Sequence, residues 1–360
     1  MYEKMKSARN IGTLQVKNRV VMTSLGLELA AENGGVSEEL IRFYEARAKG
    51  GVGLIITGIT RVKDGAGAGE MRQLAARGWQ DIEGLRKLAD AIHQQGTKIV
   101  VQLHHPGNQL TVLMNTKPEA PSPVCGNEDM LMPHELSEAE CENLVMDFVR
   151  GARVAQLAGM DGVELHAAHF YLINEFLTPI YNKRTDKYGG NFEKRMTFLL
   201  QIIEGIHEKC GENFPVIVRI MADEFTEGGN TLAEGIAIAK ALEKAGVHAI
   251  DVSCGGRLCI EPASYGPGSK KELALAIKNA VNIPIIAVNN IKMPQEAEEL
   301  LQKNVSDFIG MGRGLIADSD WVKKAFEGRE NEIVRCISCF RCYNEIYQMQ
   351  RVVCTVNPDI

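Results

Sequence analysis

The alternation of short apolar runs with amphipathic stretches constrains the fold of this 360-residue chain more than any other feature. From about Val20 to Gly312, runs rich in β-branched residues are separated by longer stretches with helical periodicity. The runs are almost continuously apolar, which is typical of parallel strands buried on both faces. The eight predicted strands are Arg19–Met22, Gly53–Thr57, Lys98–Leu103, Gly162–His166, Pro215–Ile220, Ala249–Ser253, Pro284–Val288 and Phe308–Met311.

Helices are predicted between these strands from apolar periodicity and from capping signals. Ser137 begins a Ser-Glu-Ala-Glu capping box, and Pro294 stands where a first helical residue belongs. Eight strand–helix units in order favour an α/β fold of the (β/α)8 TIM barrel type over an open doubly wound sheet. The predicted helices are Glu38–Lys49, Asp81–Gln95, Ser137–Ala158, Phe192–Cys210, Leu232–Ala245, Lys270–Val281 and Pro294–Lys303.

Charge and hydropathy exclude several classes of partner. The net charge is −6 and no long run of Lys or Arg occurs, so nucleic acid is not expected as a partner. The N-terminus lacks the apolar core of a signal peptide, and the longest apolar runs are strand-length, so no membrane span is expected. We expect a cytoplasmic protein. Its nine cysteines then indicate metal binding or buried thiols rather than disulfides.

Two long loops follow predicted strands at the end of the barrel where such enzymes carry out chemistry. They cover about His104–Glu135 and His166–Gly190. The second begins with His166, His169 and Tyr171 within six positions. Imidazole N–H groups can polarise a carbonyl and a tyrosine hydroxyl can deliver a proton. A single histidine would more often be a packed structural residue, but this combination at a strand end favours a catalytic site.

The segment Gly162–Arg195, GVELHAAHFYLINEFLTPIYNKRTDKYGGNFEKR, resembles the signature region of the old yellow enzyme family. It is most similar to the branch that contains 2,4-dienoyl-CoA reductase and trimethylamine dehydrogenase. Further similar stretches cover essentially the whole chain in order. They are KNRVVMTS at 17–24, GGVGLIITG at 50–58, VQLHHPG at 101–107, VRIMADE at 218–224, DVSCGG at 251–256 and DFIGMGRGLIAD at 307–318.

The resemblance implies that the barrel binds FMN. By resemblance, the amide of Gln102 contacts the flavin pyrimidine edge, and Arg219 lies near N1 and the C2 carbonyl, where its charge stabilises the anionic reduced flavin. Arg313 suits the phosphate. The implied FMN-binding residues are Ser24, Gly58, Gln102, Arg219, Asn289, Gly312 and Arg313.

The resemblance also implies a reaction, the reduction of an activated C=C bond in a small unsaturated carbonyl compound. The substrate carbonyl would lie between His166 and His169, hydride would reach the β carbon from the flavin, and Tyr171 would protonate the α carbon. Two alternatives remain open: an amine dehydrogenase of the trimethylamine dehydrogenase type, and a flavin and iron–sulfur electron carrier.

Some residues depart from the pattern of the family. The glycine that often ends strand 7 is replaced by Asn289-Asn290, and Gly26 stands where one-domain bacterial members can carry a cysteine near flavin N5. A histidine that dienoyl-CoA reductases carry after strand 6 is not evident in CGGRLCIEP at 254–262, which weakens a dienoyl-CoA assignment.

Four cysteines near the end of the chain have the spacing of a metal site. By spacing alone, Cys336-x2-Cys339-x2-Cys342-x11-Cys354 suits a [4Fe–4S] cluster and structural zinc about equally. The family resemblance favours the cluster, because relatives carry one after the FMN barrel. We therefore expect a barrel over residues 1–330 and an iron–sulfur segment over residues 331–360.

The last residues, VNPDI, resemble the start of a region that binds FAD and NAD(P)H in relatives. We expect this chain either to be part of a longer polypeptide or to receive electrons from a separate donor protein. Electrons would pass from NAD(P)H through FAD and the cluster to FMN. The sequence leaves open the substrate, the choice between NADH and NADPH, and whether the chain forms a homo-oligomer.

Overall fold

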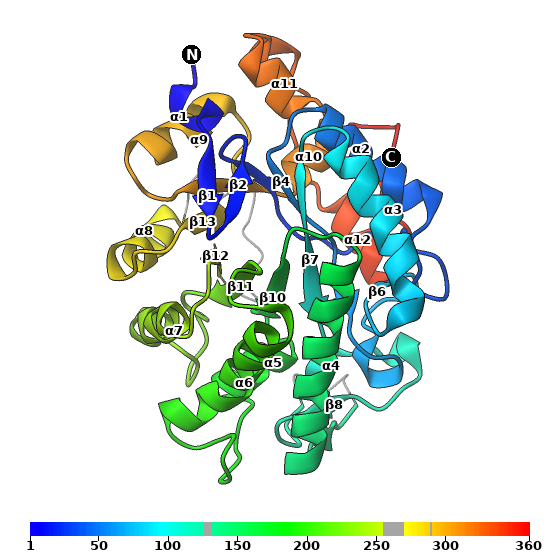
Figure 1. The fold of residues 1–360 in the computed structure, drawn as a ribbon, viewed down its shortest axis with the longest axis vertical. Coiled ribbons are helices and arrows are strands. Elements are labelled where there is room, and N and C mark those ends of the chain that lie inside the picture. The colour runs from blue at the N-terminus through cyan, green and yellow to red at the C-terminus, as the bar shows by residue number, and fades with distance from the viewer. Residues whose placement is uncertain (126–130, 255–269, 289) are drawn as a thin grey trace.

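The predicted barrel is present in the computed structural model, which describes residues 1–125, 131–254, 270–288 and 290–360. Within these residues, eight parallel strands close into a ring in the order β3, β4, β7, β10, β11, β12, β13, β14 and back to β3 (Figure 1). The ring strands are β3 (Val20–Met22), β4 (Leu54–Ile56), β7 (Lys98–His104), β10 (Val163–Ala167), β11 (Val216–Met221), β12 (Ala249–Ser253), β13 (Ile285–Val288) and β14 (Phe308–Met311).

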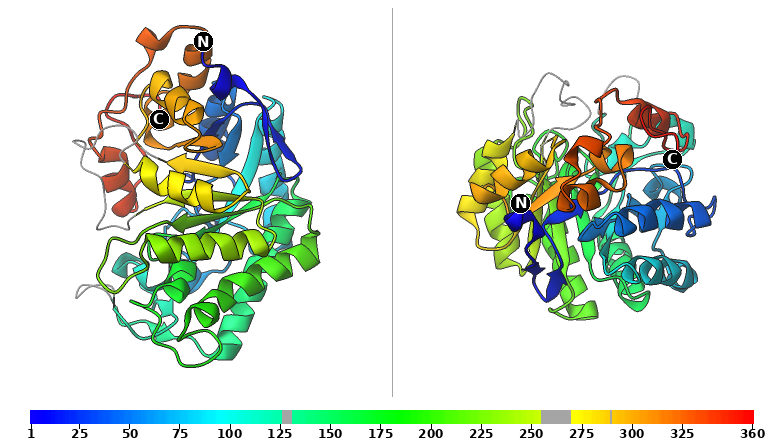
Figure 2. Two further views of the ribbon diagram at one scale, coloured as in Figure 1. Left: turned by 90° about the vertical axis from the view of Figure 1, so that its left-hand side faces the viewer. Right: turned by 90° about the horizontal axis from the view of Figure 1, so that it is seen from above.

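Helices surround the barrel, as the alternation in the sequence predicts (Figure 2). Each of the seven predicted helices is present with ends within two residues of the expected ones. Ser137 and Glu140 form the predicted capping box, and Pro294 is the first residue of its helix. These helices are α2 (Glu38–Lys49), α3 (Ile82–His93), α4 (Glu138–Leu157), α6 (Phe192–Cys210), α7 (Leu232–Lys244), α8 (Lys271–Ala280) and α9 (Pro294–Gln302).

Short elements that the sequence pattern did not indicate complete the fold. Several of them lie in the long loops or near the C-terminus, where they shape the end of the barrel. They are the helices α1 (Glu3–Lys6), α5 (Leu172–Leu177), α10 (Arg313–Ala317), α11 (Trp321–Phe326) and α12 (Arg341–Tyr347), and the strands β1 (Arg9–Ile11), β2 (Leu14–Val16), β5 (Thr60–Arg61), β6 (Leu74–Ala75), β8 (Glu119–Ala120) and β9 (His134–Glu135).

The interior of the barrel is apolar at one end and polar at the other. One buried cluster contains inward-facing residues of the ring, including Val100 of β7, Ile217 of β11 and Ala249 of β12. Ile11 and Val16 of the β1–β2 hairpin belong to the same cluster and close this end. Because side chains alternate along a strand, the residues two positions further on also face inward, at the carboxyl end of the barrel.

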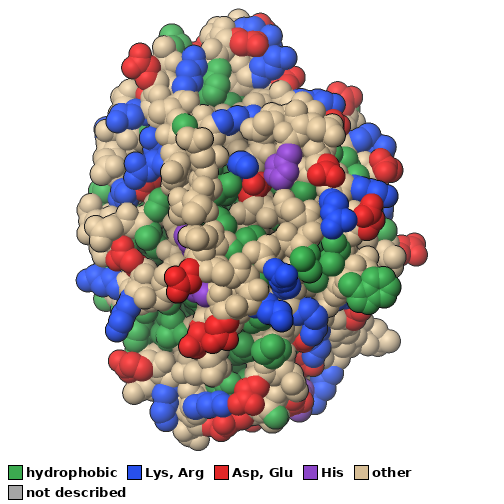
Figure 3. All heavy atoms as spheres, in the orientation of Figure 1, with side chains coloured by type: hydrophobic (Ala, Val, Ile, Leu, Met, Phe, Trp, Pro, Cys, Tyr) green, Lys and Arg blue, Asp and Glu red, His purple; other side chains and the backbone are tan. Residues whose placement is uncertain are grey.

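The surface carries both charge signs. Figure 3 shows Lys and Arg interspersed with Asp and Glu over one face, with hydrophobic side chains scattered between them. In the part of the chain that the structure describes, no helix is long and apolar enough to cross a membrane.

A stacked aromatic pair holds α5 and α6 together behind the predicted catalytic loop. Phe198 of α6 is fully buried, and its ring centroid lies 4.2 Å from that of Phe176 in α5, with the planes 16° apart. We expect Phe198→Ala to lower the free energy of unfolding by about 3–5 kcal/mol, because it leaves a cavity between these helices. Leu157→Ala, at a position 46% exposed on α4, should change it by less than about 0.5 kcal/mol. Equal effects of the two substitutions in denaturant titrations would contradict this assignment.

Candidate active site

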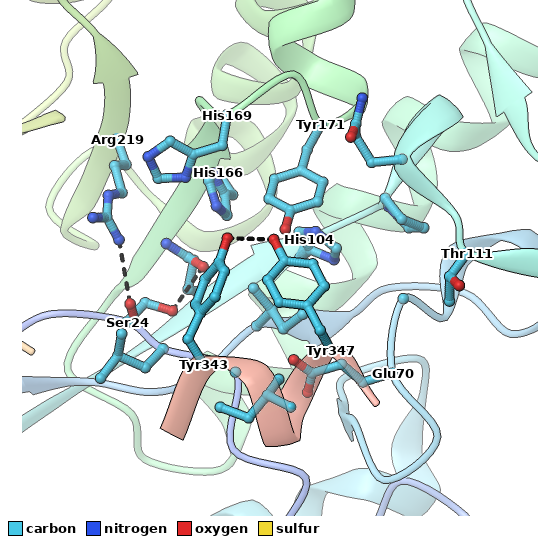
Figure 4. A pocket seen from close by; sticks show the side chains of 18 of the residues that line it. Ser24, Glu70, His104, Thr111, His166, His169, Tyr171, Arg219, Tyr343 and Tyr347 are labelled. Carbon is cyan, nitrogen blue, oxygen red and sulfur yellow. Dashed lines mark hydrogen bonds between the residues drawn. The ribbon is translucent and has the colours of Figure 1, made fainter. Parts of the chain in front are cut away.

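A cavity of about 300 Å³ opens at the carboxyl end of the barrel. Figure 4 shows side chains from several strands and from the C-terminal helix α12 directed into it. Of the predicted residues, it brings together Ser24, Gln102, His166, His169, Tyr171 and Arg219. Chemistry at this end is usual for (β/α)8 barrels, because the loops that follow the strands meet there.

A layer of buried polar side chains forms the floor of the cavity. The Ser24 hydroxyl donates to Gln102 Oε1 at 2.7 Å, and Gln102 Nε2 donates to Glu164 Oε1 at 2.6 Å. Gln102 and Glu164 are register partners on β7 and β10. These contacts fix the orientation of the Gln102 amide, which keeps a second N–H and a second lone pair for a ligand.

Arg219 supplies the positive charge of this layer. Its Nε lies 3.3 Å from Asp251 Oδ2, and its Nη1 donates to the Ser24 carbonyl oxygen at 3.3 Å. The charge of Arg219 also acts on a second buried carboxyl group, Glu164 of the neighbouring strand β10. Burial raises the pKa of Glu164 to about 8, with the neighbouring Asp251 adding to the rise and Arg219 opposing it. Burial also raises the pKa of Asp251.

The predicted catalytic residues form one aromatic group above this floor. The ring centroids of His166 and His169 are 5.1 Å apart, and that of Tyr171 lies 4.9 Å from His166. His166 is the last inward-facing residue of β10, whereas His169 and Tyr171 come from the turn that follows it. His169 Nε2 lies 2.7 Å from the Ser253 hydroxyl at the end of β12. The sequence motif thus converges on one site.

This turn has an uncommon backbone that buried polar contacts hold in place. His169 and Phe170 have φ angles of 62° and 58°, values that side chains other than glycine rarely adopt. The Phe170 N–H donates to Asn174 Oδ1 at 2.8 Å, and Asn174 Nδ2 donates to Glu224 Oε1 at 3.1 Å. Glu224 also accepts from the Thr178 hydroxyl at 2.6 Å. These bonds stabilise the turn that presents His169 to the cavity.

Burial keeps the imidazoles of the cavity neutral. It lowers the pKa of His169 to about 3, with Arg219 contributing, and lowers the pKa of His166 well below its usual value, with His169 and His104 contributing. A neutral imidazole donates through one nitrogen and accepts through the other. The histidines therefore act here as hydrogen-bond donors rather than as cations at neutral pH.

His104, at the end of β7, is a third imidazole of this site that the sequence reasoning did not select. Gln73 Oε1 accepts the Gly69 N–H at 2.7 Å, so its amide nitrogen faces His104 Nδ1, at 3.2 Å. That amide nitrogen can only donate, which leaves the His104 proton on Nε2. Nε2 is buried without a hydrogen-bond partner among the described residues. Alternation from Gln102 along the strand was the available signal, because residues 102 and 104 face the same side.

The C-terminal helix α12 contributes to the cavity, which the sequence did not indicate. Tyr343 and Tyr347 line the cavity together with Ile346, and their two hydroxyl groups form a hydrogen bond (Figure 4). Side chains near the cysteines therefore lie over the polar floor of the barrel. A substrate in the cavity would meet barrel residues on one side and this helix on the other.

Gly58, Gly312 and Arg313 lie outside the described lining of this cavity. Gly58 donates its N–H to the Tyr44 hydroxyl at 2.5 Å, and a β-carbon there would stand 2.4 Å from the Leu25 carbonyl oxygen. The close packing against Leu25 therefore requires glycine at position 58. Gly312 precedes α10, and Arg313 is the first residue of that helix. Asn289 lies outside the described residues; its neighbour Asn290 has a φ of 52°.

The four predicted cluster ligands line one small hollow. Cys336, Cys339, Cys342 and Cys354 surround it, together with Arg313 and Phe340. No three acidic, cysteine or histidine side chains among the described residues are close enough to hold a single metal ion. The four cysteines that the sequence predicts as ligands nevertheless come together around one hollow of the structure.

Unpaired buried donors at the barrel mouth fit an anionic cofactor. Arg313 Nη1 is buried with no hydrogen-bond partner in the described part of the chain, and its guanidinium lies 4.5 Å from the Phe340 ring centroid. A guanidinium in this state suits a phosphate. Together with the amide of Gln102 and the charge of Arg219, it provides groups that fit a flavin mononucleotide.

Comparison with known proteins agrees with this site. A sequence model of the NADH:flavin oxidoreductase / NADH oxidase family matches residues 9–332. The chain is 46% identical to an NADH oxidase of Thermoanaerobacter brockii, over 98% of this chain and 55% of that protein. It is 31% identical to a cinnamate reductase of Clostridium sporogenes, over 97% and 56%. A 2-naphthoyl-CoA reductase structure superposes with a TM-score of 0.95 at 30% identity, over 99% and 57%.

These matches define a flavin-dependent oxidoreductase on a (β/α)8 barrel. The chain belongs to the NADH:flavin oxidoreductase / NADH oxidase family. It spans just over half the length of the three relatives described above.

The polar floor has a consequence for stability that can be measured. The folded state holds the Glu164 proton up to about pH 8, whereas an unfolded glutamic acid releases it near about pH 4.3. Stability should therefore fall as the pH rises through this interval, because the unfolded state binds fewer protons. We expect Glu164→Gln, which has no proton to lose, to be less sensitive to pH than the wild type in urea unfolding. Identical pH profiles would contradict a buried, protonated Glu164.

Proposed function

We propose that this chain is the substrate-reducing part of an FMN-dependent ene-reductase that acts on activated C=C bonds of unsaturated carbonyl compounds. The observation that carries the proposal is the convergence of neutral imidazoles and Tyr171 on one cavity above the Gln102–Arg219 floor. The names of two relatives, a cinnamate reductase and a 2-naphthoyl-CoA reductase, support it.

The floor residues would hold the flavin. Gln102 would bind its pyrimidine edge, Arg219 would lie beside the ring position that becomes negative on reduction, and Arg313 would bind the phosphate. When bound, FMN supplies the hydride. Ser24 contributes by orienting Gln102 through its hydroxyl, and Gly312 would border the phosphate.

His166 and His169 would bind the substrate carbonyl. His166 Nδ1 is buried without a hydrogen-bond partner in the described structure, and His169 is oriented through Ser253. Charge develops on the carbonyl oxygen during reduction, and a donor already in position stabilises it without reorganisation. One such donor is typically worth about 3 kcal/mol in the transition state.

Tyr171 would deliver the proton to the α carbon. Its ring lies edge-on to His104, with centroids 4.5 Å apart, and edge-on to His166. The three rings hold the phenol in position over the floor, while the His104 Nε2 proton adds a donor close by. Aromatic packing of this kind restricts the ring to one orientation, which protonation of a single carbon requires.

The four cysteines would hold a [4Fe–4S] cluster that passes single electrons toward the flavin. Because Arg313 borders both the cysteine hollow and the proposed phosphate position, the two cofactors would be neighbours. The FAD and NAD(P)H sites would belong to a further region or to a separate electron donor, since the chain spans only part of its relatives.

One observation favours amine oxidation as a second candidate. Tyr171, Tyr343 and Tyr347 line the cavity, and aromatic rings are the usual partners of alkylated ammonium groups. The imidazole pair supports the carbonyl reaction, because each neutral ring can direct its N–H donor at a carbonyl oxygen. Anaerobic mixing of reduced enzyme with an enone, and of oxidised enzyme with an amine, separates the two reactions.

Tyr171→Phe tests the proton donor. We expect reoxidation of the reduced flavin by cyclohexenone to slow by roughly 10²-fold or more, the usual contribution of a general acid, while the flavin stays bound. Stopped-flow absorbance measures both. Tyr181→Phe, at a tyrosine outside the cavity lining, should react at the wild-type rate. An unchanged rate in Tyr171→Phe would exclude this residue as the required donor.

Replacement of both His166 and His169 by alanine tests the carbonyl clamp. Phenolic ligands that give a long-wavelength band with the oxidised flavin should bind at least tenfold more weakly, because two preorganised donors are lost. His134→Asn, at an exposed histidine that is not part of the cavity lining, is the control. Unaltered affinity in the double variant would rule out the clamp.

Cys342→Ser tests the cluster. We expect iron and acid-labile sulfide per flavin to drop sharply after anaerobic purification, because one of four thiolate ligands is lost. Cys210→Ser at the end of α6 should keep both at the wild-type level. Stoichiometric zinc in the wild-type protein, in place of iron and sulfide, would overturn the cluster assignment.

A further inference from the structure

Glu70 places a carboxyl group on the wall of the cavity, where neither the family pattern nor the mechanism above uses one. Its side chain is 8% exposed and faces the cavity from the loop before β6. In Figure 4 it lies across the cavity from His166 and His169. A β-carbon on Gly26 would stand 1.9 Å from Glu70 Oε1, so this carboxyl occupies the space that a side chain at residue 26 would need.

Among the described residues around Glu70, no cation forms an ion pair that would neutralise its carboxylate. Glu28, whose carboxylate accepts the Met71 and Arg72 N–H groups at 3.0 and 2.7 Å, is an acid whose charge acts on Glu70. Tyr44 of α2 is close enough for its pKa to respond to the charge of Glu70, and His104 of β7 and Tyr347 of α12 line the same cavity. Among the described residues, no ion pair includes Glu70.

Burial raises the pKa of Glu70 to about 8, and Glu28 adds to the rise. The backbone N–H groups of Glu28 and Leu27 oppose it. Glu70 is therefore mostly protonated at neutral pH and becomes an anion in mildly alkaline solution, within a range where the protein can be measured.

The charge of Glu70 can determine which ligands bind, because the described cavity wall offers no free cation to offset it. Among the described lining residues, Arg219 is the only cation, and it is already paired with Asp251. A carboxylate ligand would thus meet neutral imidazoles and phenols on its way in, with no free cation in the described wall. An uncharged carbonyl compound can use the same imidazole donors without placing a second negative charge beside Glu70 when that group is ionised.

We propose that Glu70, once it is ionised in mildly alkaline solution, makes the cavity select its ligands by charge, favouring uncharged unsaturated carbonyl compounds, such as amides, esters and thioesters, over free carboxylates. This inference deepens the proposed function and rests on it for the identity of the substrate. The position of Glu70, opposite the donors that would hold the carbonyl, means that its charge acts on whatever occupies the space between them.

The test compares two ligands of the same shape and different charge, cinnamamide and cinnamate. Neither titrates between about pH 6 and about pH 9. Binding to the oxidised, flavin-loaded enzyme is followed by the change in flavin absorbance, without turnover. We expect the affinity for cinnamate to fall roughly tenfold over this range in the wild type, and the affinity for cinnamamide to stay constant.

Glu70→Gln should abolish the fall for cinnamate, because its side chain stays neutral at every pH used. Glu70→Met serves if the glutamine variant loses its flavin. Glu45→Gln, at a surface acid on α2 that pairs with Lys49, should keep the wild-type profile. A pH-independent affinity for cinnamate in the wild type overturns the proposal, as does a fall that persists in Glu70→Gln, or a failure of cinnamamide to bind.

This experiment separates the inference from the proposed function. Charge selection is measured as an equilibrium with oxidised flavin, so it can hold in a protein that reduces neither compound. Conversely, rapid reduction of both ligands with no Glu70-dependent pH effect would support the ene-reductase and overturn the role of Glu70.

Discussion

The site depends on one cation whose charge acts on two buried carboxyl groups. Arg219 lies within the barrel between Asp251 and Glu164, and each of the three is held on a different strand. Removing the guanidinium would leave two acids in an apolar interior, which is costly, so its position is tightly determined. Through Gln102 and Ser24 the same network fixes the amide that would bind the flavin, so the cofactor floor is a property of the barrel core rather than of its loops.

Because of this arrangement, neutral histidine donors lie above a floor that carries the charge of Arg219. The positive charge of Arg219 and the lack of solvent both lower the pKa of His169, so it keeps a neutral ring that donates through one nitrogen. A cationic imidazole would bind a carbonyl more strongly before reaction and would also repel Arg219. The fold thus separates two tasks: charge is held at the floor, where reduction of a cofactor would create an anion, and uncharged donors face the substrate.

The barrel and much of the site could be predicted from the sequence because their signals are local. Apolar runs identify each strand within one or two residues, and His166 and Arg219 are register partners simply because each lies near the end of its strand. His104 was missed although its alternation with Gln102 gave a signal. Gly58 was assigned to the flavin, but packing against the Leu25 carbonyl already explains its glycine.

Contributions from distant segments had no such signal. Tyr343 and Tyr347 lie on a seven-residue helix in the cysteine segment, and their place over the cavity depends on how that segment packs on the barrel. Glu70 follows a glycine-rich stretch that reads as an ordinary loop, and its role becomes visible only beside Gly26. The glycine at residue 26 and the buried carboxyl at residue 70 are related, because the carboxyl fills the space that a side chain at residue 26 would occupy. A single sequence shows the first as a departure from the family pattern, whereas the structure shows that a titratable group has taken its place.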